Sequence, residues 1–301
     1  MSEPISRRSF IAGLAASGAA LPLAGLAVAS APATPPPFRK AVKLGMVGEG
    51  ASLLEKFELL RELGFDGVEL DSPNGLDEAE VLAARDATGL VIHGVVDSAH
   101  WGKPFNHPDA AVRAEGVAAL RTALRDAHAY GASTVLVVPA VVNKQNGYGP
   151  AWDHARAEIG KALPLAEELG VKIAFENVWN GFLLSPLETR RFIESFESDH
   201  VGAYFDVGNV VRYAWPEHWI EVLADKILKI DVKEYSRKKQ NDEGLWKGFQ
   251  AELLEGDNDW PAVMKALKAV GYAGWFTAEV AGGGRERLAF LAERMDRILA
   301  S

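Results

Sequence analysis

From Val42 onward, short apolar runs alternate with longer amphipathic segments. The apolar runs are mostly β-branched or aromatic and are bounded by Gly, Pro or Asp, as expected for parallel strands that are buried on both faces. We therefore predict eight strands, at Val42–Val47, Gly67–Asp71, Val91–Val96, Thr134–Pro139, Lys172–Glu176, Gly202–Asp206, Leu228–Val232 and Trp275–Glu279.

The segments between these strands have the periodicity of amphipathic helices. Three of them end in Gly64, Gly131 and Gly170, and glycine is favoured just after a helix. Eight strand–helix units fill residues 42–300, which is the number in an α/β protein with a single (β/α)8 TIM barrel. An open doubly wound sheet is the alternative architecture for the same alternation.

The N-terminal segment has a different pattern. Arg7 and Arg8 precede an apolar, alanine-rich run, small residues at 27–29 offer a cleavage site, and prolines follow at 35–37. This pattern resembles a twin-arginine export signal. We predict a signal peptide at 1–33, a linker at 34–40, a barrel at 41–301 and a periplasmic protein without stable membrane association after cleavage. An uncleaved membrane anchor and a chance arginine pair are the alternatives.

Composition narrows the classes of partner. The chain has 301 residues, a net charge of −9 and no cysteine. The negative charge disfavours nucleic acid and anionic membranes as non-specific partners, and the lack of cysteine excludes disulfides and thiolate metal sites. The sequence leaves the oligomeric state open, and a homo-oligomer is one state that it allows.

Four acidic residues lie near the ends of four successive predicted strands: Glu176, Asp206, Asp231 and Glu279. The C-terminal strand ends of a parallel barrel meet at one mouth, so these carboxylates are expected to face one another there. Their mutual repulsion would be relieved by a divalent cation, and Mg²⁺ and Mn²⁺ prefer oxygen ligands. Each acid taken alone is as well explained as a helix cap or a solvated strand end.

An ordered set of segments resembles the sugar isomerase/epimerase superfamily with a xylose isomerase-like TIM barrel. The resemblance runs from about Lys40 to the C-terminus and rests on LRELGFDGVELDSP, FENVWN, FDVGN, KIDVKEY, LLEGDNDWPAV and FTAEV. It implies that Glu176, Asp206, Asp231 and Glu279 hold the divalent metal, with Mg²⁺ or Mn²⁺ as the cofactor. The superfamily typically has a histidine where this chain has Asp231, and Asn209 stands where a histidine is usual after the sixth strand.

The resemblance implies proton abstraction next to a carbonyl through an enediolate, with Glu176 and Glu279 as the acid–base pair. Sugar isomerisation or epimerisation is the leading prediction, and the partner is a small sugar or keto-sugar. The same site would serve a keto-glycoside lyase, and the replacement at Asp231 is compatible with a catalytically silent sugar-binding barrel. A phosphodiesterase resembling endonuclease IV is disfavoured by the seven histidines and the net charge of −9.

Further candidates surround this predicted site. Glu69 and Asn209 are expected to orient its ligands, and Lys229 and Lys233 to offset its negative charge. The glycine-rich turn before Arg285 is an anion-site candidate, although a solvated loop is the favoured interpretation. The residues expected to bind the substrate are His93, His100, Trp101, Asn177, Lys233 and Trp246, with Trp179 and Asn180 as rim candidates.

Overall fold

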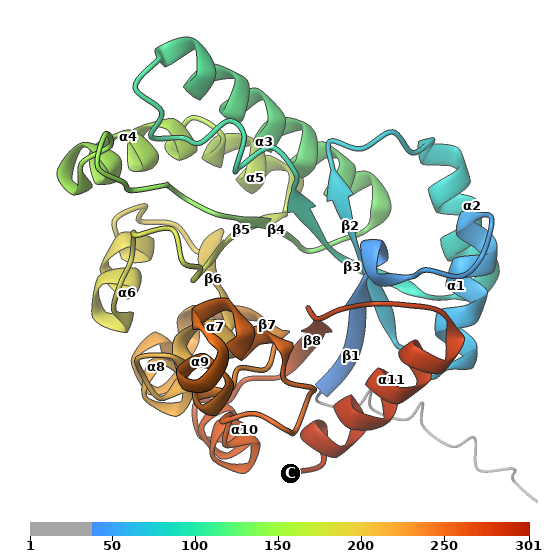
Figure 1. The fold of residues 1–301 in the computed structure, drawn as a ribbon. Coiled ribbons are helices and arrows are strands. Elements are labelled where there is room, and N and C mark those ends of the chain that lie inside the picture. Colours follow the sequence, from blue (N-terminus) through green and yellow to red (C-terminus); the bar gives the residue numbers. More distant parts are fainter. Residues whose placement is uncertain (1–37) are drawn as a thin grey trace, which may run out of the picture. The chain divides into compact units, whose positions relative to one another are not determined.

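The structure is a computed structural model that describes residues 38–301. Eight parallel strands close into a barrel in the order β1 to β8, with helices around it (Figure 1). The predicted single (β/α)8 barrel is confirmed, and the open doubly wound sheet is wrong. The strands are β1 Phe38–Lys43, β2 Gly67–Ser72, β3 Val91–Asp97, β4 Thr134–Val137, β5 Lys172–Glu176, β6 Val201–Asp206, β7 Ile227–Val232 and β8 Gly274–Ala278.

The helices begin and end at residues of the expected kinds. Ser52 forms a capping box with Glu55 at the start of the first helix, and Gly131 and Gly170 end two others in the left-handed conformation. The α-helices are α1 Leu53–Glu62, α2 Glu78–Thr88, α3 Ala110–Tyr130, α4 Tyr148–Gly160, α5 Leu163–Leu169, α6 Pro186–Glu194, α7 Gly208–Val211, α8 Pro216–Leu223, α9 Arg237–Glu243, α10 Trp260–Ala269 and α11 Arg285–Leu299. Three short 3-10 helices are η1 Leu44–Met46, η2 Ala224–Lys226 and η3 Leu245–Gln250.

The first strand lies four residues earlier than the sequence pattern predicts. β1 begins at Phe38, whose ring packs edge-to-face on Phe276 of β8 at 5.3 Å, and it ends at Lys43, where η1 starts. Its first three residues fall in the segment expected to be a linker. The expected signal peptide and the rest of that linker lie outside the described residues.

The barrel interior is small and partly polar. Leu136, Ala174 and Tyr204 form its apolar cluster, while the larger apolar core lies between the strands and the surrounding helices. Lys43 and Glu69 also extend into this interior and form an ion pair there. Charged groups so placed need partners, and those partners form the floor of the candidate site.

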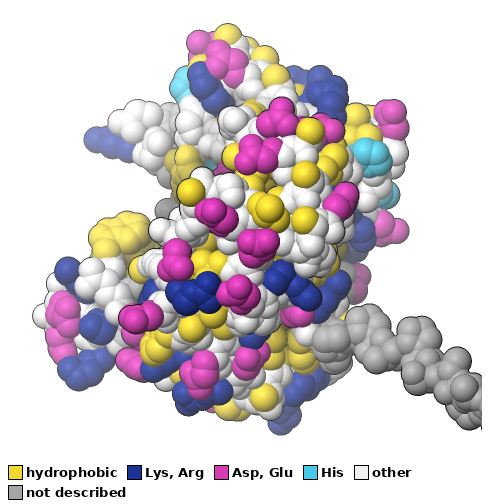
Figure 2. All heavy atoms as spheres, turned by 90° about the vertical axis from the view of Figure 1, so that its right-hand side faces the viewer, with side chains coloured by type: hydrophobic (Ala, Val, Ile, Leu, Met, Phe, Trp, Pro, Cys, Tyr) yellow, Lys and Arg dark blue, Asp and Glu magenta, His cyan; other side chains and the backbone are white. Residues whose placement is uncertain are grey.

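The insertion after β7 is the longest loop at the C-terminal mouth. It spans 233–259, carries α9 and η3, and precedes α10. Across residues 38–301, none of the helices combines the length and apolar character needed to cross a membrane. On the face of the molecule shown in Figure 2, acidic and basic side chains are interspersed.

Candidate active site

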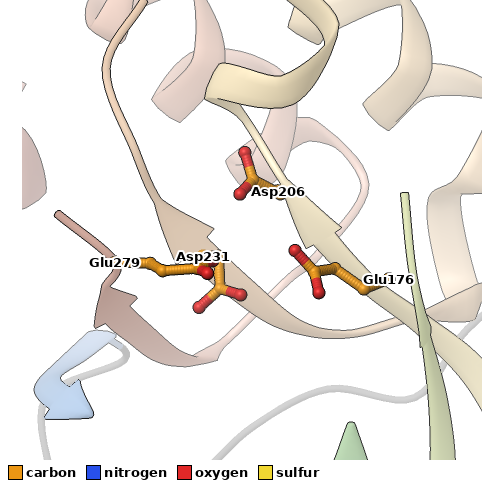
Figure 3. A group of neighbouring side chains, drawn as sticks. All are labelled: Glu176, Asp206, Asp231 and Glu279. Carbon is orange, nitrogen blue, oxygen red and sulfur yellow. The ribbon is translucent and has the colours of Figure 1, made fainter. Parts of the chain in front are cut away.

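The four predicted carboxylates meet at the mouth of the barrel. Glu176 and Asp206 are the last residues of β5 and β6, Asp231 lies in β7 opposite Asp206 in register, and Glu279 follows β8. One oxygen from each lies within 4.8 Å of the other three. Figure 3 shows Glu176 and Glu279 entering this group from opposite sides. The sequence therefore predicted the members of this cluster correctly, and it placed them at the right end of the barrel.

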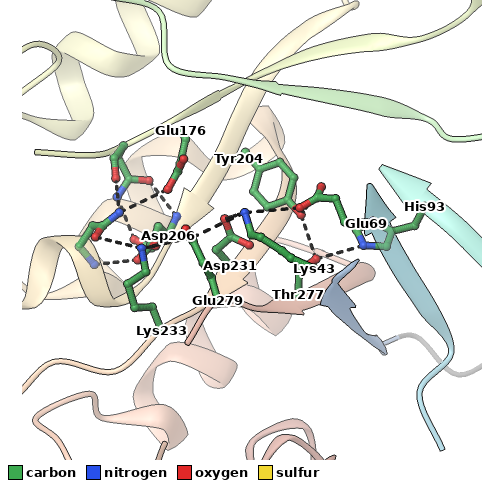
Figure 4. A network of polar contacts seen from close by, with 12 residues as sticks. Lys43, Glu69, His93, Glu176, Tyr204, Asp206, Asp231, Lys233, Thr277 and Glu279 are labelled. Carbon is green, nitrogen blue, oxygen red and sulfur yellow. Dashed lines mark hydrogen bonds and ion pairs between the residues drawn. The ribbon is translucent and has the colours of Figure 1, made fainter. Parts of the chain in front are cut away.

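Two lysines share this acidic cluster (Figure 4). Lys233 Nζ lies 2.9 Å from Asp206 Oδ2 and 3.2 Å from Glu279 Oε2. Lys43 Nζ lies 3.3 Å from Asp231 Oδ2, 3.4 Å from Glu69 Oε2 and 3.7 Å from Glu279 Oε2. Sequence reasoning expected Lys233 at the site but missed Lys43. A lysine within the buried run AVK of the first strand was the signal that could have revealed it.

Burial and mutual repulsion separate the acid strengths of the two glutamates. Burial, with the charge of Glu279, raises the pKa of Glu176 well above its usual range. Burial alone would raise the pKa of Glu279 as well, but Lys43 and Lys233 lower it to about 2. The pair thus has the unequal acid strengths that suit one proton donor and one proton acceptor.

Asp231 is the best evidence that a cation fits the cluster. Its Oδ2 faces Lys43, whereas its buried Oδ1 has no hydrogen-bond partner among residues 38–301. Burial, followed by the nearby carboxylates Glu279 and Glu176, raises its pKa well above the usual range although Lys43 opposes the shift. A divalent ion would satisfy the free oxygen and relieve the repulsion.

The charges around the cluster support the same conclusion. Two lysine ammonium groups, Lys43 and Lys233, contact the four carboxylates, so the cluster carries excess negative charge when all of these groups are ionised. A divalent cation would reduce that excess.

Below the acidic cluster, a second polar network fills the barrel. Tyr204 donates a hydrogen bond to Glu69 Oε1 at 3.0 Å, and its hydroxyl lies 2.9 Å from Thr277 Oγ1 (Figure 4). Glu69, predicted to support the site, pairs with Lys43 and not with one of the four carboxylates. Glu69, Tyr204 and Thr277 are buried, so their hydrogen bonds to one another satisfy polar groups that are removed from the solvent.

His93 is a correction to the sequence prediction. It lies near the start of β3 rather than at the mouth, and its buried ring contacts Lys229 Nζ at 3.0 Å and Thr277 Oγ1 at 3.2 Å. It also stacks on Trp275, so it is placed to fill the barrel and not to bind a substrate. Lys229 is a second correction, because its ammonium group donates to His93 and does not contact the four carboxylates. The sequence placed His93 and Lys229 on the correct strands, but it placed both side chains too close to the mouth of the barrel.

The asparagines at the rim are mostly structural. Both ends of the Asn177 side chain hydrogen-bond the backbone of Asp206, at 2.8 and 2.9 Å. Asn180 likewise spans the backbone of Ala140 and Phe182. Each amide thus uses one N–H and its carbonyl oxygen to hold the backbone at the rim, and its role toward a sugar stays a prediction.

Asn209, predicted to support the site, contacts two of the four carboxylates. Its backbone N–H donates to Asp206 Oδ1 at 2.7 Å, and its side-chain amide donates to Glu176 Oε1 at 3.4 Å. It therefore joins two of the four carboxylates.

His100 and Trp101 lie on the loop after β3, beside the mouth. The His100 Nδ1 accepts a hydrogen bond from the Val138 N–H at 3.2 Å, which places its proton on Nε2. Burial, with the charge of Lys43, lowers the pKa of His100 to about 4, so the ring is neutral at physiological pH. Trp101 is 52% exposed and lines the cavity above the carboxylates, and its contact with a sugar stays a prediction.

The cavity above the carboxylates has a volume of about 440 Å³. Its floor includes Glu176, Glu279 and Lys233, and its walls are largely aromatic. Trp246 of η3, predicted as a substrate contact, lies 4.9 Å from Trp179 between ring centroids. The cavity thus combines charged groups at its base with ring faces above them, an arrangement typical of small-molecule sites.

The glycine-rich turn before α11 is not an open anion site. The carboxylate of Glu49 accepts a hydrogen bond from the Arg285 N–H at 2.7 Å at the start of this helix. The Arg285 side chain pairs with Glu49 at 3.5 Å and with Glu62 at 2.7 Å. The favoured interpretation of a loop with a solvated arginine differs from the structure in that Arg285 is held by these two glutamates.

Comparison with known proteins identifies the family. Residues 57–297 match the family model described as xylose isomerase-like TIM barrel. Because that match covers most of the chain, the protein belongs to this family. The resemblance inferred from the sequence motifs is confirmed at this level.

Several relatives are named as sugar epimerases. The chain is 25% identical over 245 residues to L-ribulose-5-phosphate 3-epimerase UlaE of Escherichia coli O1:K1, with 77% of this chain and 83% of that enzyme covered. A solved D-tagatose 3-epimerase-like protein aligns with a TM-score of 0.72 at 19% identity, covering 87% of this chain and 97% of the other. The 3-keto-D-glucoside 4-epimerase YcjR of E. coli aligns with a TM-score of 0.70 at 17% identity, covering 88% and 100%. At these identities the structural likeness shows the shared fold.

Proposed function

We propose that this protein is a sugar isomerase or epimerase that moves a proton next to a carbonyl group and depends on a divalent cation. The observation that carries the proposal is the convergence of Glu176, Asp206, Asp231 and Glu279 at the mouth. The family and its sugar-epimerase relatives support the class of reaction. Mg²⁺ and Mn²⁺ suit the all-oxygen donor set best.

The four carboxylates would hold the cation. When bound, it would polarise the carbonyl and the adjacent hydroxyl and so lower the cost of the enediolate. Glu176 and Glu279 reach the cavity from opposite sides (Figure 3), so one could remove a proton from one face of the sugar while the other returns a proton to the opposite face. Lys43 and Lys233 keep Glu279 ionised, so that its carboxylate is available to accept a proton.

A keto-glycoside lyase is the second candidate for the same site. The enediolate chemistry is shared, and elimination would follow if a β-oxygen left before the proton returned. The aromatic cavity gives room for the leaving group. We also propose, on the sequence of residues 1–33 alone, that the protein is exported to the periplasm by the twin-arginine route.

A hydrogen-exchange assay tests the proposed chemistry. The purified protein with Mg²⁺ or Mn²⁺ is incubated in D₂O with a panel of ketoses and 3-keto-glycosides, and the products are followed by NMR. We expect deuterium at the carbon next to the carbonyl, with a new epimer or isomer, and loss of both after chelation. Substrate binding without any exchange would instead identify a catalytically silent sugar-binding barrel.

A further inference from the structure

The cavity walls above the carboxylates are the feature that the proposed reaction does not explain. Trp179, Trp246 and Phe249 form a cluster of rings on one side, with centroids 4.8 Å apart for Trp179 and Phe249 and 6.3 Å for Trp246 and Phe249. Trp101 lines the cavity from the loop after β3. Trp101 and Trp246 are 52% and 66% exposed, so both present ring surface that nothing in residues 38–301 covers.

Large exposed aromatic rings at the rim need a ligand surface to explain them. Isolated exposed apolar residues are common, but here two tryptophans lie at the rim of one cavity that has acid–base groups at its base. The C–H faces of a sugar ring or an aryl group can pack on such rings. The carboxylates at the base would take the reacting carbonyl, which leaves the upper aromatic part for a second ring.

The same cavity is poorly suited to a phosphate group. Within residues 38–301, the one cationic side chain that lines it is Lys233, which is already paired with Asp206 and Glu279. TIM barrels commonly bind phosphate beside the loops after the last two strands, at a helix N-terminus. In this chain the Glu49 carboxylate already accepts the hydrogen bond from the Arg285 N–H at the start of α11, which a phosphate would otherwise accept.

We propose that the site takes an uncharged keto-sugar that carries a second ring, as in a disaccharide or an aryl glycoside, and that it discriminates against sugar phosphates. The inference rests on the proposed function for the position of the carbonyl. The substrate class would thus differ from that named for the relative L-ribulose-5-phosphate 3-epimerase.

Isothermal titration calorimetry with matched ligands tests the inference. One series is D-fructose, D-fructose 6-phosphate and isomaltulose, which differ only in the group on the 6-oxygen. The other pairs methyl with phenyl 3-keto-β-D-glucoside. In at least one series we expect the ligand with the second ring to bind at least tenfold more tightly than its parent, and the phosphate ester to bind more weakly than fructose.

Tryptophan variants test whether the preference for a second ring arises in this cavity. Trp246→Ala and Trp101→Ala should each remove most of the preference for the second ring, by about fivefold or more in Kd, and Trp246→Phe should restore part of it. Trp215→Ala is the matched control, because Trp215 is 55% exposed but lies outside the cavity lining. Loss of the preference in this control as well would overturn the assignment to the cavity.

The outcomes separate this inference from the proposed function. Tightest binding by the phosphate ester, or no gain from the second ring in either series, overturns the substrate class even if proton exchange is observed. Tight, tryptophan-dependent binding of the ring-bearing ligands without exchange upholds the cavity assignment and overturns the proposed chemistry instead.

Discussion

Glu176 and Glu279 differ from the other two carboxylates because both line the cavity where a substrate would lie. Replacing either by glutamine keeps an oxygen of similar position but removes the ability to accept a proton. We expect kcat to fall by about 10²–10⁴-fold or more, with a smaller change in KM. Steady-state kinetics on a substrate found by the exchange assay would measure this.

Asp206→Asn is the comparison for those two variants. Asp206 is fully buried and touches Lys233, so its replacement should weaken cation binding, and excess Mg²⁺ or Mn²⁺ should restore part of the rate. Near-normal turnover in both glutamine variants would rule out the two-carboxylate mechanism.

Asp97 offers a prediction about stability rather than catalysis. It is buried at the end of β3, and burial raises its pKa to about 7 although the Ala99 N–H donates to its Oδ1. Because the folded pKa exceeds the unfolded value, the folded state binds the extra proton, and the free energy of unfolding should fall as pH rises from about 4 to about 7. Asp97→Asn should remove that loss and stabilise the protein at pH 8 by an amount on the order of 3 kcal/mol, with little effect at pH 4.

Urea unfolding at both pH values would measure the Asp97 effect. Asp71→Asn is the control, since Asp71 is an exposed aspartate on the neighbouring strand β2. Equal responses of the two variants to pH would show that burial of Asp97 does not have the predicted consequence.

At the scale of elements, a buried carboxylate near the start of the insertion after β7 joins that start to the end of the insertion and to α10. Glu234 accepts hydrogen bonds from the Leu254 N–H at 2.9 Å, the Trp260 Nε1–H at 3.1 Å and the Asn258 N–H at 3.2 Å. The insertion that it anchors carries Trp246. Glu234 therefore positions the aromatic wall without touching the cavity.

Glu234→Gln should loosen this insertion. The amide keeps the size of the side chain but replaces one acceptor by a donor, which opposes the donors already facing it and costs roughly 1–3 kcal/mol. We expect faster hydrogen exchange in residues 235–259, measured by mass spectrometry, and a higher KM. Glu255→Gln, in the same segment but paired with Arg294 at the surface, should change neither. Unchanged exchange in the Glu234 variant would contradict the anchoring role.

The strands and helices were easier to predict from the sequence than the positions of individual side chains inside the barrel. The alternation of apolar runs with amphipathic segments predicts the barrel because parallel strands are buried on both faces, and glycines mark the ends of several helices. The carboxylates were found because each lies at or next to the end of a strand. His93 was misplaced because the sequence does not give the depth of a residue in the barrel, and the backbone partners of Asn177 were not foreseen because they lie on another strand. Lys43 was missed because two of its partners, Asp231 and Glu279, come from the far end of the chain.

For the whole molecule, cation binding should appear as thermal stabilisation. A ligand that binds only the folded state adds about 2.7 kcal/mol at a concentration of 100 times its Kd, which corresponds to a rise in Tm of about 5–10 °C. We expect Mg²⁺ or Mn²⁺ to produce such a rise and a chelator to reverse it. Asp231→Asn should abolish the response, and identical melting curves with and without chelator, with no metal by elemental analysis, would disprove the site.

The proposed export can be tested in cells. Arg7→Lys combined with Arg8→Lys should leave an unprocessed precursor in the cytoplasm, because the paired arginines are what the twin-arginine route reads. Fractionation and immunoblotting would detect it. Arg121→Lys, an exposed change in α3, is the control for expression. Efficient export of the double variant would show that the arginine pair is incidental.

The pairing of β1 with β8, the first and last strands, makes the site depend on closure of the barrel. Lys43 ends the first strand and Glu279 follows the last, and their contact forms only when these two strands pair. The site is therefore incomplete in any partly folded state in which β1 and β8 are not paired, even when the individual strands and helices have formed. A ligand bound at the mouth would stabilise the pairing of β1 with β8, and its binding would show that the barrel has closed.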